Sequence, residues 1–325
     1  ALAKGIVERD VVQIITPGAN MNLADSDNNY IVAVDETDLN YVIAYADLST
    51  GETNVMNVEH DWTSLISELD NLLTREIVVS SNFSKETLEE ITNKRKILVS
   101  YEDDDQIELE FEDLLSEVQD LYQMKAVVRL LHYLRRTQKR ELDYFQQVHV
   151  IKSYRTLQID SFSRLNLELV RTIRSEEKYG SLYWLLDHTK TAMGGRLLKH
   201  WIQKPSSDLE EILSRQSMVT SLIEHFMKRE ELIRALDAVY DLERLIARIS
   251  FGNANGRDLL QLKTSLKAVP ILKDILNEFE NENLKKIASS MDALEDIASL
   301  IEKAIREDAP ITIKEGGIFL PGYNK

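Results

Sequence analysis

The chain has 325 residues, no cysteine and a formal net charge of −16. Without cysteine it forms no disulfide and no thiolate metal site, and a reducing cytoplasm is the expected location. No run of about 18 apolar residues and no apolar signal segment is present, so the sequence predicts neither a membrane span nor secretion. Five prolines and eleven glycines are few, as is typical of a mainly helical protein.

Charge is uneven along the chain, which indicates two separately built halves. Residues 1–120 hold 7 Lys and Arg against 27 Asp and Glu, whereas residues 121–325 hold 32 against 28. Because phosphate contacts need Lys and Arg, the acidic half disfavours a DNA-binding surface there. A solvated acidic surface is the simpler interpretation of that half.

The first half has the sequence pattern of an α/β fold. The β-branched run 11–16 is strand-like and ends at the turn signal Pro17-Gly18. The whole series after it reads, in order, as strands at 30–35, 41–46 and 53–58, a helix at 61–73 capped by Asp61, a strand at 76–80, a helix at 85–93 capped by Ser84, and a strand at 96–100. The first two strands form a predicted hairpin, and a hairpin followed by alternating helices and strands favours an α/β layer fold.

The second half is predicted to be almost wholly helical. An acidic connector at 101–120 and a helix at 121–136 precede it, and it begins with a strand-like stretch at 148–160. Apolar residues at helical spacing predict helices near 163–174, 181–187, 192–203, 208–226, 228–237, 239–250, 256–267, 270–278 and 284–306. Periodicity is lost over 310–325, so the sequence leaves the course of that tail open.

The basic stretch 121–140 is the strongest candidate for contact with nucleic acid. It contains six basic residues and no acidic one: Lys125, Arg129, Arg135, Arg136, Lys139 and Arg140. Two interpretations stay open, namely contact with DNA phosphates, and pairing with the acidic half or plain solvation. We favour the second, because a strongly acidic domain lies next to this helix in the sequence.

The sequence predicts no catalytic, cofactor or metal site. The nucleotide-binding spacing G-x-x-x-x-G-K-[ST] occurs nowhere, so Gly194-Gly195 is interpreted as a place of close packing in the first helical turn after Thr191. The acidic run 102–105 lacks the glycine and terminal glutamate of a calcium loop. The six histidines do not have the spacing of a zinc site.

Asp35 and Asp47 raise the alternative of a nuclease that uses metal ions. Such an enzyme needs two or more carboxylates that converge on the metal. A hairpin loop centred near Asp38 would place Asp35 opposite Tyr41 and Asp47 opposite Asn29. We therefore expect the two acids to lie well apart and to have no catalytic role.

Two long motifs in the second half carry most of the identifying information. They are residues 182–204, LYWLLDHTKTAMGGRLLKHWIQK, and residues 240–266, YDLERLIARISFGNANGRDLLQLKTSL. Both resemble the core domain of the MutS family of DNA mismatch repair ATPases. The matching positions, which we expect to be structural, are Thr191, Met193, Gly194, Gly195, Arg196, Trp201, Asp241, Leu242, Glu243, Arg244, Asn255, Arg257 and Asp258. Similarity to the same family extends over 8–18, 20–120, 159–169 and 311–324.

The resemblance implies an RNase H-like α/β connector domain followed by an all-helical core domain with the start of a lever. It divides the chain into a linker at 1–19, the connector at 20–120, a basic linking helix at 121–147 and the core at 148–325. It further implies a fragment of a larger bacterial protein, without that protein's mismatch-recognition, clamp and ATPase domains.

The same resemblance implies what the parent does. It would bind mismatched DNA as a homodimer and use ATP and Mg in its ATPase domain, so this fragment would hold no cofactor and would not itself be an enzyme. The expected role is a structural and allosteric relay in the bacterial cytoplasm, at the nucleoid, with MutL bound through the connector.

Two other classes of function stay open. One is an RNase H-like nuclease with a helical regulatory region, which a third carboxylate converging beside Asp35 would favour. The other is a purely structural helical scaffold, which would be favoured if the full-length parent bound no DNA.

Overall fold

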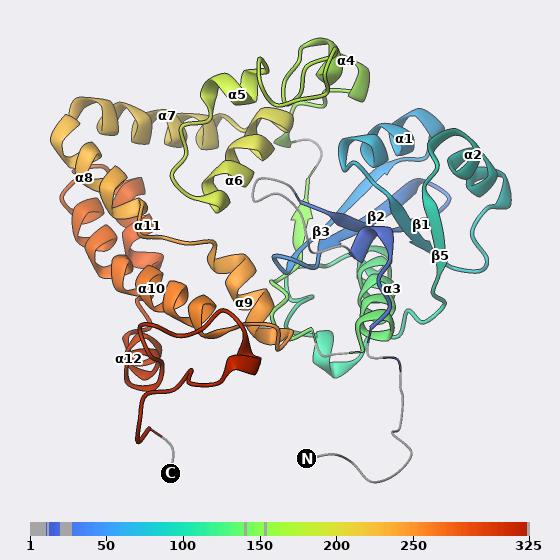
Figure 1. The fold of residues 1–325 in the computed structure, drawn as a ribbon. Coiled ribbons are helices and arrows are strands. Elements are labelled where there is room, and N and C mark those ends of the chain that lie inside the picture. The colour runs from blue at the N-terminus through green and yellow to red at the C-terminus, as the bar shows by residue number, and fades with distance from the viewer. Residues whose placement is uncertain (1–10, 12, 20–27, 140–141, 153–154, 324–325) are drawn as a thin grey trace, which may run out of the picture. The chain divides into compact units, whose positions relative to one another are not determined.

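The computed structural model of the chain describes residues 11, 13–19, 28–139, 142–152 and 155–323. These residues form two compact units, divided in the sequence between Ile151 and Lys152. The first unit contains a β-sheet with helices, and the second is built from helices (Figure 1). This organisation confirms the predicted α/β half followed by a helical half. No helix among the described residues is long and apolar enough to cross a membrane.

The first unit is organised around a six-stranded sheet in the order β5-β4-β1-β2-β3-β6. The described strands are β1 (Tyr30–Glu36), β2 (Asn40–Asp47), β3 (Glu52–Glu59), β4 (Glu76–Val79), β5 (Leu98–Tyr101) and β6 (His149–Ile151). Strands β1, β2 and β3 form an antiparallel meander. Strands β4 and β5 extend the sheet in parallel beyond β1, and β6 adds in parallel to β3.

The hairpin between β1 and β2 is confirmed, but its predicted register was wrong by one residue. Its turn has two central residues, because the backbone N–H of Thr37 donates to the carbonyl of Asn40 at 2.9 Å. The centre of the turn therefore lies after Asp38, and Asp35 pairs with Val42 while Asp47 pairs with Tyr30. The two acids still stand at opposite ends of the hairpin, as expected.

Helices cover both faces of this sheet (Figure 1). Helices α1 (Trp62–Asn71) and α2 (Lys85–Arg95) begin at the predicted caps, Asp61 and Ser84, whose side chains accept backbone N–H groups. Apolar residues of both helices pack with alternate strand residues such as Val32 in one core cluster. The strand residues between these point to the opposite face of the sheet, because successive side chains of a strand alternate. Helix α3 (Leu121–Gln138) packs on that face against β1 to β4.

Helix α3 thus belongs to the first compact unit, which extends to Ile151. Its buried face includes Leu130, Leu131 and Leu134. Small residues on the strands, such as Ala33 and Ala44, are fully buried and leave room for a helix to approach closely. The domain limits at residues 19, 120 and 147 stay predictions.

The run 11–16 was predicted as a strand, and its described residues form no strand. Instead, the N–H of Ile14 donates to the carbonyl of Thr137 at 2.8 Å, at the end of α3. A 3-10 turn, η1 (Pro17–Ala19), follows, and the N–H of Gly18 donates to the buried carboxylate of Glu76 at 3.0 Å. The backbone groups of this segment bond to a helix end and a side chain, which periodicity alone does not reveal.

The second unit is built from nine described helices. They are α4 (Ser161–Asn166), α5 (Leu182–Leu186), α6 (Ala192–Gln203), α7 (Leu209–Glu224), α8 (Phe226–Leu236), α9 (Leu242–Ser250), α10 (Gly256–Asn277), α11 (Glu282–Ser290) and α12 (Glu295–Ala304). Helix α10 contacts α8, α9, α11 and α12. Its first half contributes Leu262 and Leu266 to one core cluster and its second half contributes Ile275 and Leu276 to another.

Four predicted helices of this unit were wrong in extent: those at 163–174, 256–267, 270–278 and 284–306. The helix expected at 163–174 ends at Asn166, because the following backbone turns back and the N–H of Tyr183 donates to the carbonyl of Leu169 at 2.8 Å. The expected break before Pro270 is absent, since this proline lies inside α10. The helix expected at 284–306 is divided by a break at 291–294, which begins with the extended Met291 and ends with the left-handed Leu294.

The tail after α12 follows a defined course up to Tyr323. It returns along the end of that helix, where the N–H of Arg306 donates to the carbonyl of Ile318 at 2.9 Å and the N–H of Leu320 to the carbonyl of Ala304 at 2.8 Å. A Cβ atom added to Gly256 would lie 2.7 Å from Ala309 Cβ, so the start of α10 needs a glycine where the chain beyond α12 crosses it.

Candidate functional site

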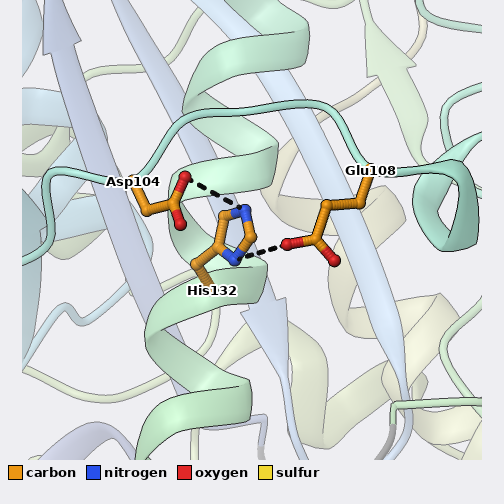
Figure 2. Close-up of side chains that lie close together, drawn as sticks. All are labelled: Asp104, Glu108 and His132. Atoms are coloured by element: carbon orange, nitrogen blue, oxygen red, sulfur yellow. Dashed lines mark ion pairs between the residues drawn. The ribbon is translucent and has the colours of Figure 1, made fainter.

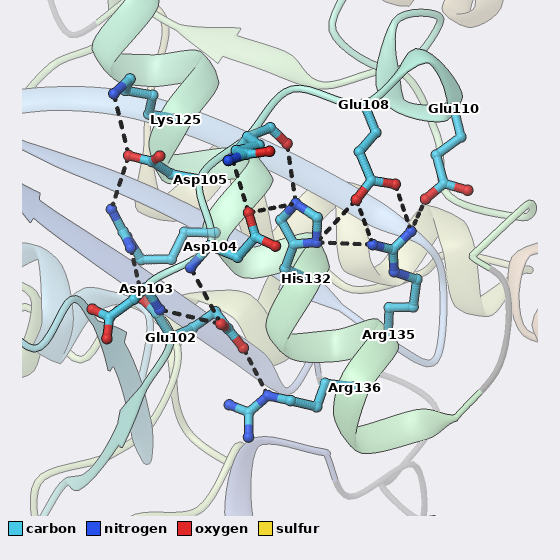
Figure 3. Close-up of polar contacts among 12 residues, drawn as sticks. Glu102, Asp103, Asp104, Asp105, Glu108, Glu110, Lys125, His132, Arg135 and Arg136 are labelled. Atoms are coloured by element: carbon cyan, nitrogen blue, oxygen red, sulfur yellow. Dashed lines mark hydrogen bonds and ion pairs between the residues drawn. The ribbon is translucent and has the colours of Figure 1, made fainter.

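The basic helix α3 is covered along one side by an acidic segment of the same unit, residues 102–110 (Figure 3). The helix is capped at its N-terminus by Asp120, whose carboxylate accepts the N–H groups of Tyr122 and Gln123. Arg129 lies deepest, with 6% of its side chain exposed, and its Nε donates to Asp35 Oδ1 at 2.9 Å. Its Nη1 donates to the carbonyl oxygen of Glu102 at 2.6 Å.

Three other cations of α3 also form ion pairs with the acidic segment 102–110. Lys125 lies 3.3 Å from Asp105, and Arg136 lies 2.7 Å from Glu102. Arg135 donates to Glu108 at 2.8 Å and also pairs with Glu110. Four of the six basic residues that were candidates for phosphate contact are therefore engaged with carboxylates of their own domain.

The remaining two candidates lie at the end of α3. Lys139 is the C-terminal cap of α3. It is exposed to solvent and has a left-handed backbone conformation with φ of 55°. Arg140 lies outside the described residues. Phosphate contact by any of the six stays a prediction, but a DNA strand would have to compete with carboxylates for the four paired cations.

One group of side chains in the described residues has the residue types of a metal site, and His132 lies at its centre (Figure 2). Asp104, Glu108 and His132 each bring a ligand atom within 4.8 Å of the others. However, the two carboxylates lie next to different ring nitrogens. Asp104 Oδ1 is 3.6 Å from Nε2, and Glu108 Oε1 is 3.8 Å from Nδ1. One ion does not bind both nitrogens of an imidazole, so the three side chains do not converge as a metal cage requires.

Both nitrogens of His132 already have polar partners. Arg135 Nη2 lies 3.0 Å from Nδ1, and a guanidinium only donates, so Nδ1 accepts. The proton is therefore on Nε2, which donates to the carbonyl of Gln106 at 3.1 Å. The positive charge of Arg135 beside Glu108 further disfavours a second cation, and we assign this group to an ion-pair network that fastens residues 102–110 to α3.

The carboxylates near Asp35 do not favour a nuclease centre. The guanidinium of Arg129 contacts both Asp35 and Asp105. The protein thus supplies its own cation to these two carboxylates.

Asp47, at the far end of the hairpin, is buried and has a structural use. Its carboxylate accepts from the N–H and hydroxyl of Ser49, each at 2.7 Å, and from the Asn28 side chain at 2.9 Å. Burial raises the pKa of Asp47, an effect that these hydrogen bonds partly offset. These contacts hold the turn after β2.

In the second unit, a buried ion pair joins the two long sequence motifs. Arg196 of α6 donates from Nη1 and Nη2 to the two carboxylate oxygens of Asp241, at 2.8 and 2.7 Å, and from Nη2 to Glu243 at 2.6 Å. We call these three residues the Arg196 triad. Burial lowers the pKa of Arg196, but the hydrogen bonds and charges of both acids outweigh it and raise the pKa above its usual value.

Asp241 has a second role as the cap of α9. Its carboxylate accepts the N–H of Arg244 at 3.4 Å, and the Nε of the buried Arg244 lies 3.7 Å from it. Leu242 packs at the edge of the core cluster formed with α10 and α12. The polar residues of this motif therefore connect α9 to α6, and its apolar residues pack α9 against α10.

The turn between α9 and α10 is fixed by a capping box. Asn255 accepts from the N–H of Asp258 at 3.0 Å, and Asp258 accepts from the N–H of Asn255 at 2.9 Å. Arg248 of α9 reaches Asp258 at 2.9 Å, and Arg257 Nε donates to the carbonyl of Ala309 at 3.3 Å. These contacts give structural roles to the signature positions in the Gly-Asn-Ala-Asn-Gly turn.

The Gly194-Gly195 pair lies in the first turn of α6, after the cap Thr191, which accepts the N–H of Gly194 at 3.0 Å. A Cβ atom on Gly195 would lie 3.3 Å from the hydroxyl of the buried Tyr183, so the tight neighbour is a side chain and not another helix backbone. Met193 is half-buried, and the ring of Trp201 stacks under Arg215 at 3.7 Å.

Sequence reasoning identified the members of the Arg196 triad but not their association. Arg196 and Asp241 lie in different motifs, and no local spacing connects them. The available signal was the presence of a cation in one apolar motif and of two acids in the other.

The two units match two family models in chain order. MutS domain II matches residues 29–146 and MutS domain III matches residues 163–321. Among curated proteins, the "DNA mismatch repair protein MutS" of Bacillus pumilus (strain SAFR-032) is 45% identical over 99% of the chain, and that of Geobacillus sp. (strain WCH70) is 43% identical over 99%. The protein of the same name from Bacillus subtilis (strain 168) is 43% identical over 99%. The chain spans 38% of the length of each of these relatives.

Proposed function

This chain belongs to the MutS family, whose connector and core domains it contains, and from that premise we propose that it acts as a structural and allosteric relay within a mismatch repair protein. In this proposal the full-length parent binds mismatched DNA and uses ATP. The chain itself transmits a change at the DNA to the part of the parent that handles the nucleotide.

The observation that supports a relay is the organisation of the second unit around α10. This helix has 22 residues, and at 1.5 Å per residue it is about 33 Å long. Its two halves belong to two core clusters, one shared with α12 and one with α11. Because both halves of this helix are held by packing, it physically connects the two clusters, and a displacement of one can be carried to the other.

The partners and cofactors of the proposal follow from the same assignment. ATP and Mg would bind the parent outside this chain, whose sequence contains no G-x-x-x-x-G-K-[ST]. We propose that MutL contacts the first unit, that the parent is a homodimer, and that it works in the cytoplasm at the bacterial nucleoid. Catalysis by the chain alone is not part of the proposal.

The relay is tested in the intact parent protein by softening α10. Leu266→Ala and Leu272→Ala remove buried side chains from this helix, whereas Thr264→Ala changes an exposed position on it and is the matched control. Mismatch binding is measured with a fluorescent duplex, and ATP hydrolysis is measured with and without mismatched DNA.

We expect the double variant to retain mismatch binding and basal hydrolysis but to lose most of the dependence of hydrolysis on the mismatch. The Thr264→Ala protein should keep that dependence. Full dependence in a double variant that is measurably less stable would contradict a relay through α10.

A further inference from the structure

The first unit has a hollow of about 400 Å³ beside α3, between two loops. The loops, residues 110–114 and 142–147, are joined at their base, where the N–H of Val148 donates to the carbonyl of Leu114 at 2.9 Å. Phe111, Leu142 and Phe145 line the hollow and are almost fully buried, so they form a fixed apolar part of a wall that is otherwise polar. We call it the loop hollow.

The charged side chains that line the loop hollow are mostly acidic. They are Glu110, Asp113, Asp143 and a single cation, Arg135. The guanidinium of Arg135 is already held by Glu108 and Glu110. Asp113 and Asp143 are exposed, and among the described residues no ion pair uses their carboxylates. The hollow therefore combines a partly apolar wall with two exposed carboxylates that form no ion pair within the described part of the chain.

We propose that the loop hollow binds one lysine or arginine side chain presented by a protein partner. The alkyl stem of such a side chain covers apolar surface while its charged end stays at the polar edge. Here the stem would lie against Phe111 and Phe145, and the cation would meet Asp113 and Asp143. A hydrated metal ion would leave the apolar wall uncovered, and a nucleic acid would meet repulsion from the same carboxylates.

This inference rests on the proposed partner-binding role of the first unit, and it names the chemistry that a partner needs there. The rest of the acidic half adds to the same preference, because its net charge favours the approach of a basic surface. The contact is with a single side chain, so it should fix the position of a partner more than it adds to affinity.

The test uses the chain as it is, with isotope-labelled backbone amides observed by NMR. The probe is a glycine-flanked peptide with one lysine, and its control replaces lysine by norleucine, which keeps the stem and lacks the charge. We expect the lysine peptide to shift the amides of residues 110–114 and 142–147 selectively and to bind more tightly than the norleucine peptide.

Charge variants make the assignment specific. Asp113→Asn and Asp143→Asn should each weaken binding of the lysine peptide roughly two- to fivefold, the range of a single exposed ion pair. Glu117→Gln removes an equal charge from the same exposed segment outside the hollow and should leave the affinity unchanged.

Equal binding of the two peptides, or equal weakening by all three variants, would overturn the loop hollow as a cation site. The proposed function is judged separately, by MutL binding to the chain. If the chain binds the lysine peptide but does not bind MutL, the result would count against the proposed connector role and would still support the loop hollow as a cation site.

Discussion

Arg196 connects two helices of the second unit through charges that have little access to water. Its side chain is 7% exposed and that of Asp241 is 16% exposed. Removing one partner of a buried ion pair typically costs about 3 to 5 kcal/mol, because the other charge is left unpaired. Glu243 is 36% exposed and is better hydrated, so we expect Arg196→Ala to lower the free energy of unfolding by about 3 kcal/mol.

Urea unfolding followed by the fluorescence of Trp184 and Trp201 measures this cost, in a background where Trp62→Phe removes the signal of the first unit. Lys285→Ala, which breaks an exposed pair with Glu282, is the control and should cost less than about 0.5 kcal/mol. Equal costs for the two variants would remove the special role of the Arg196 triad.

The side chain that position 195 can hold is limited by the neighbouring residues more than by the backbone conformation of Gly195. A Cβ atom would lie 3.3 Å from the hydroxyl of Tyr183 and 3.4 Å from that of Thr189, which is tight but within reach of a small adjustment. We expect Gly195→Ala to be nearly neutral. A valine carries two more methyl groups into the same space, and Gly195→Val should lose about 2 kcal/mol. Matching urea midpoints for the valine variant and the unaltered chain would exclude close packing here.

Asp187 gives the second unit a defined response to acid. Burial alone would raise its pKa, but hydrogen bonds from Lys178 and from Thr189 lower it, from 3.8 to about 2. A carboxyl with a lowered pKa stabilises the fold above its unfolded pKa and loses that contribution as the pH falls through the folded value. The stabilisation is therefore present above about pH 4 and is lost towards pH 2.

Asp187→Asn lacks this contribution at every pH. We expect its urea midpoint to lie below that of the unaltered chain at pH 6, and the gap to narrow as the pH falls below 4. A gap that stays constant from pH 6 to pH 3 would show that the pKa of Asp187 is not lowered.

At the scale of elements, α10 continues through Pro270 because packing on both sides outweighs the local cost. Proline has no N–H, so the carbonyl of Leu266 lacks its helical partner, and a proline inside a helix costs about 3 kcal/mol relative to alanine. Leu262 and Leu266 before it, and Ile275 and Leu276 after it, are buried in the two core clusters. Their burial holds the helix together across the missing bond.

Pro270→Ala should therefore stabilise the second unit. The gain in helical structure is reduced by the greater freedom of the unfolded chain, so we expect a net increase of about 1 kcal/mol. Pro310→Ala, which changes a proline outside any helix, is the control and should give no increase. Thermal unfolding monitored by circular dichroism provides the comparison, and a lower midpoint for Pro270→Ala would mean that the proline suits its site.

Elements with a strong local signal were predictable from the sequence. Helix α6 has the predicted bounds, because Thr191 caps it and its apolar residues repeat at helical spacing. The expected helix at 163–174 was wrong because its later backbone groups bond to the returning chain near Tyr183, a contact that has no local pattern. The division of 284–306 is a four-residue break at 291–294 that ends with Leu294, whose left-handed conformation leucine rarely takes.

The candidate sites were less predictable than the elements. The basic character of α3 was evident, but its partners come from a loop without periodicity. Arg129 meets Asp35 across 94 positions of the sequence, and Arg196 meets Asp241 across 45. Long-range pairs of this kind follow from the fold, so a single sequence gives the charges and leaves their partners open.

At the scale of the whole molecule, the charge distribution disfavours a strong grip on DNA. The chain carries a net charge of −16, and four of the six cations in its most basic stretch are engaged with carboxylates. Contacts with phosphates also carry no information about mismatches. We therefore expect the chain to connect the parts of a repair protein without reading DNA itself.

Fluorescence anisotropy with a homoduplex and a G·T mismatch duplex, at low and at physiological salt, tests this claim most directly. We expect both duplexes to bind alike, at or above the dissociation constants of about 10⁻⁴ to 10⁻⁶ M that are typical of non-specific complexes, with affinity falling steeply as salt rises. Nanomolar binding at physiological salt, or a roughly tenfold preference for the mismatch, would contradict the account, because it would place a recognition surface within this chain.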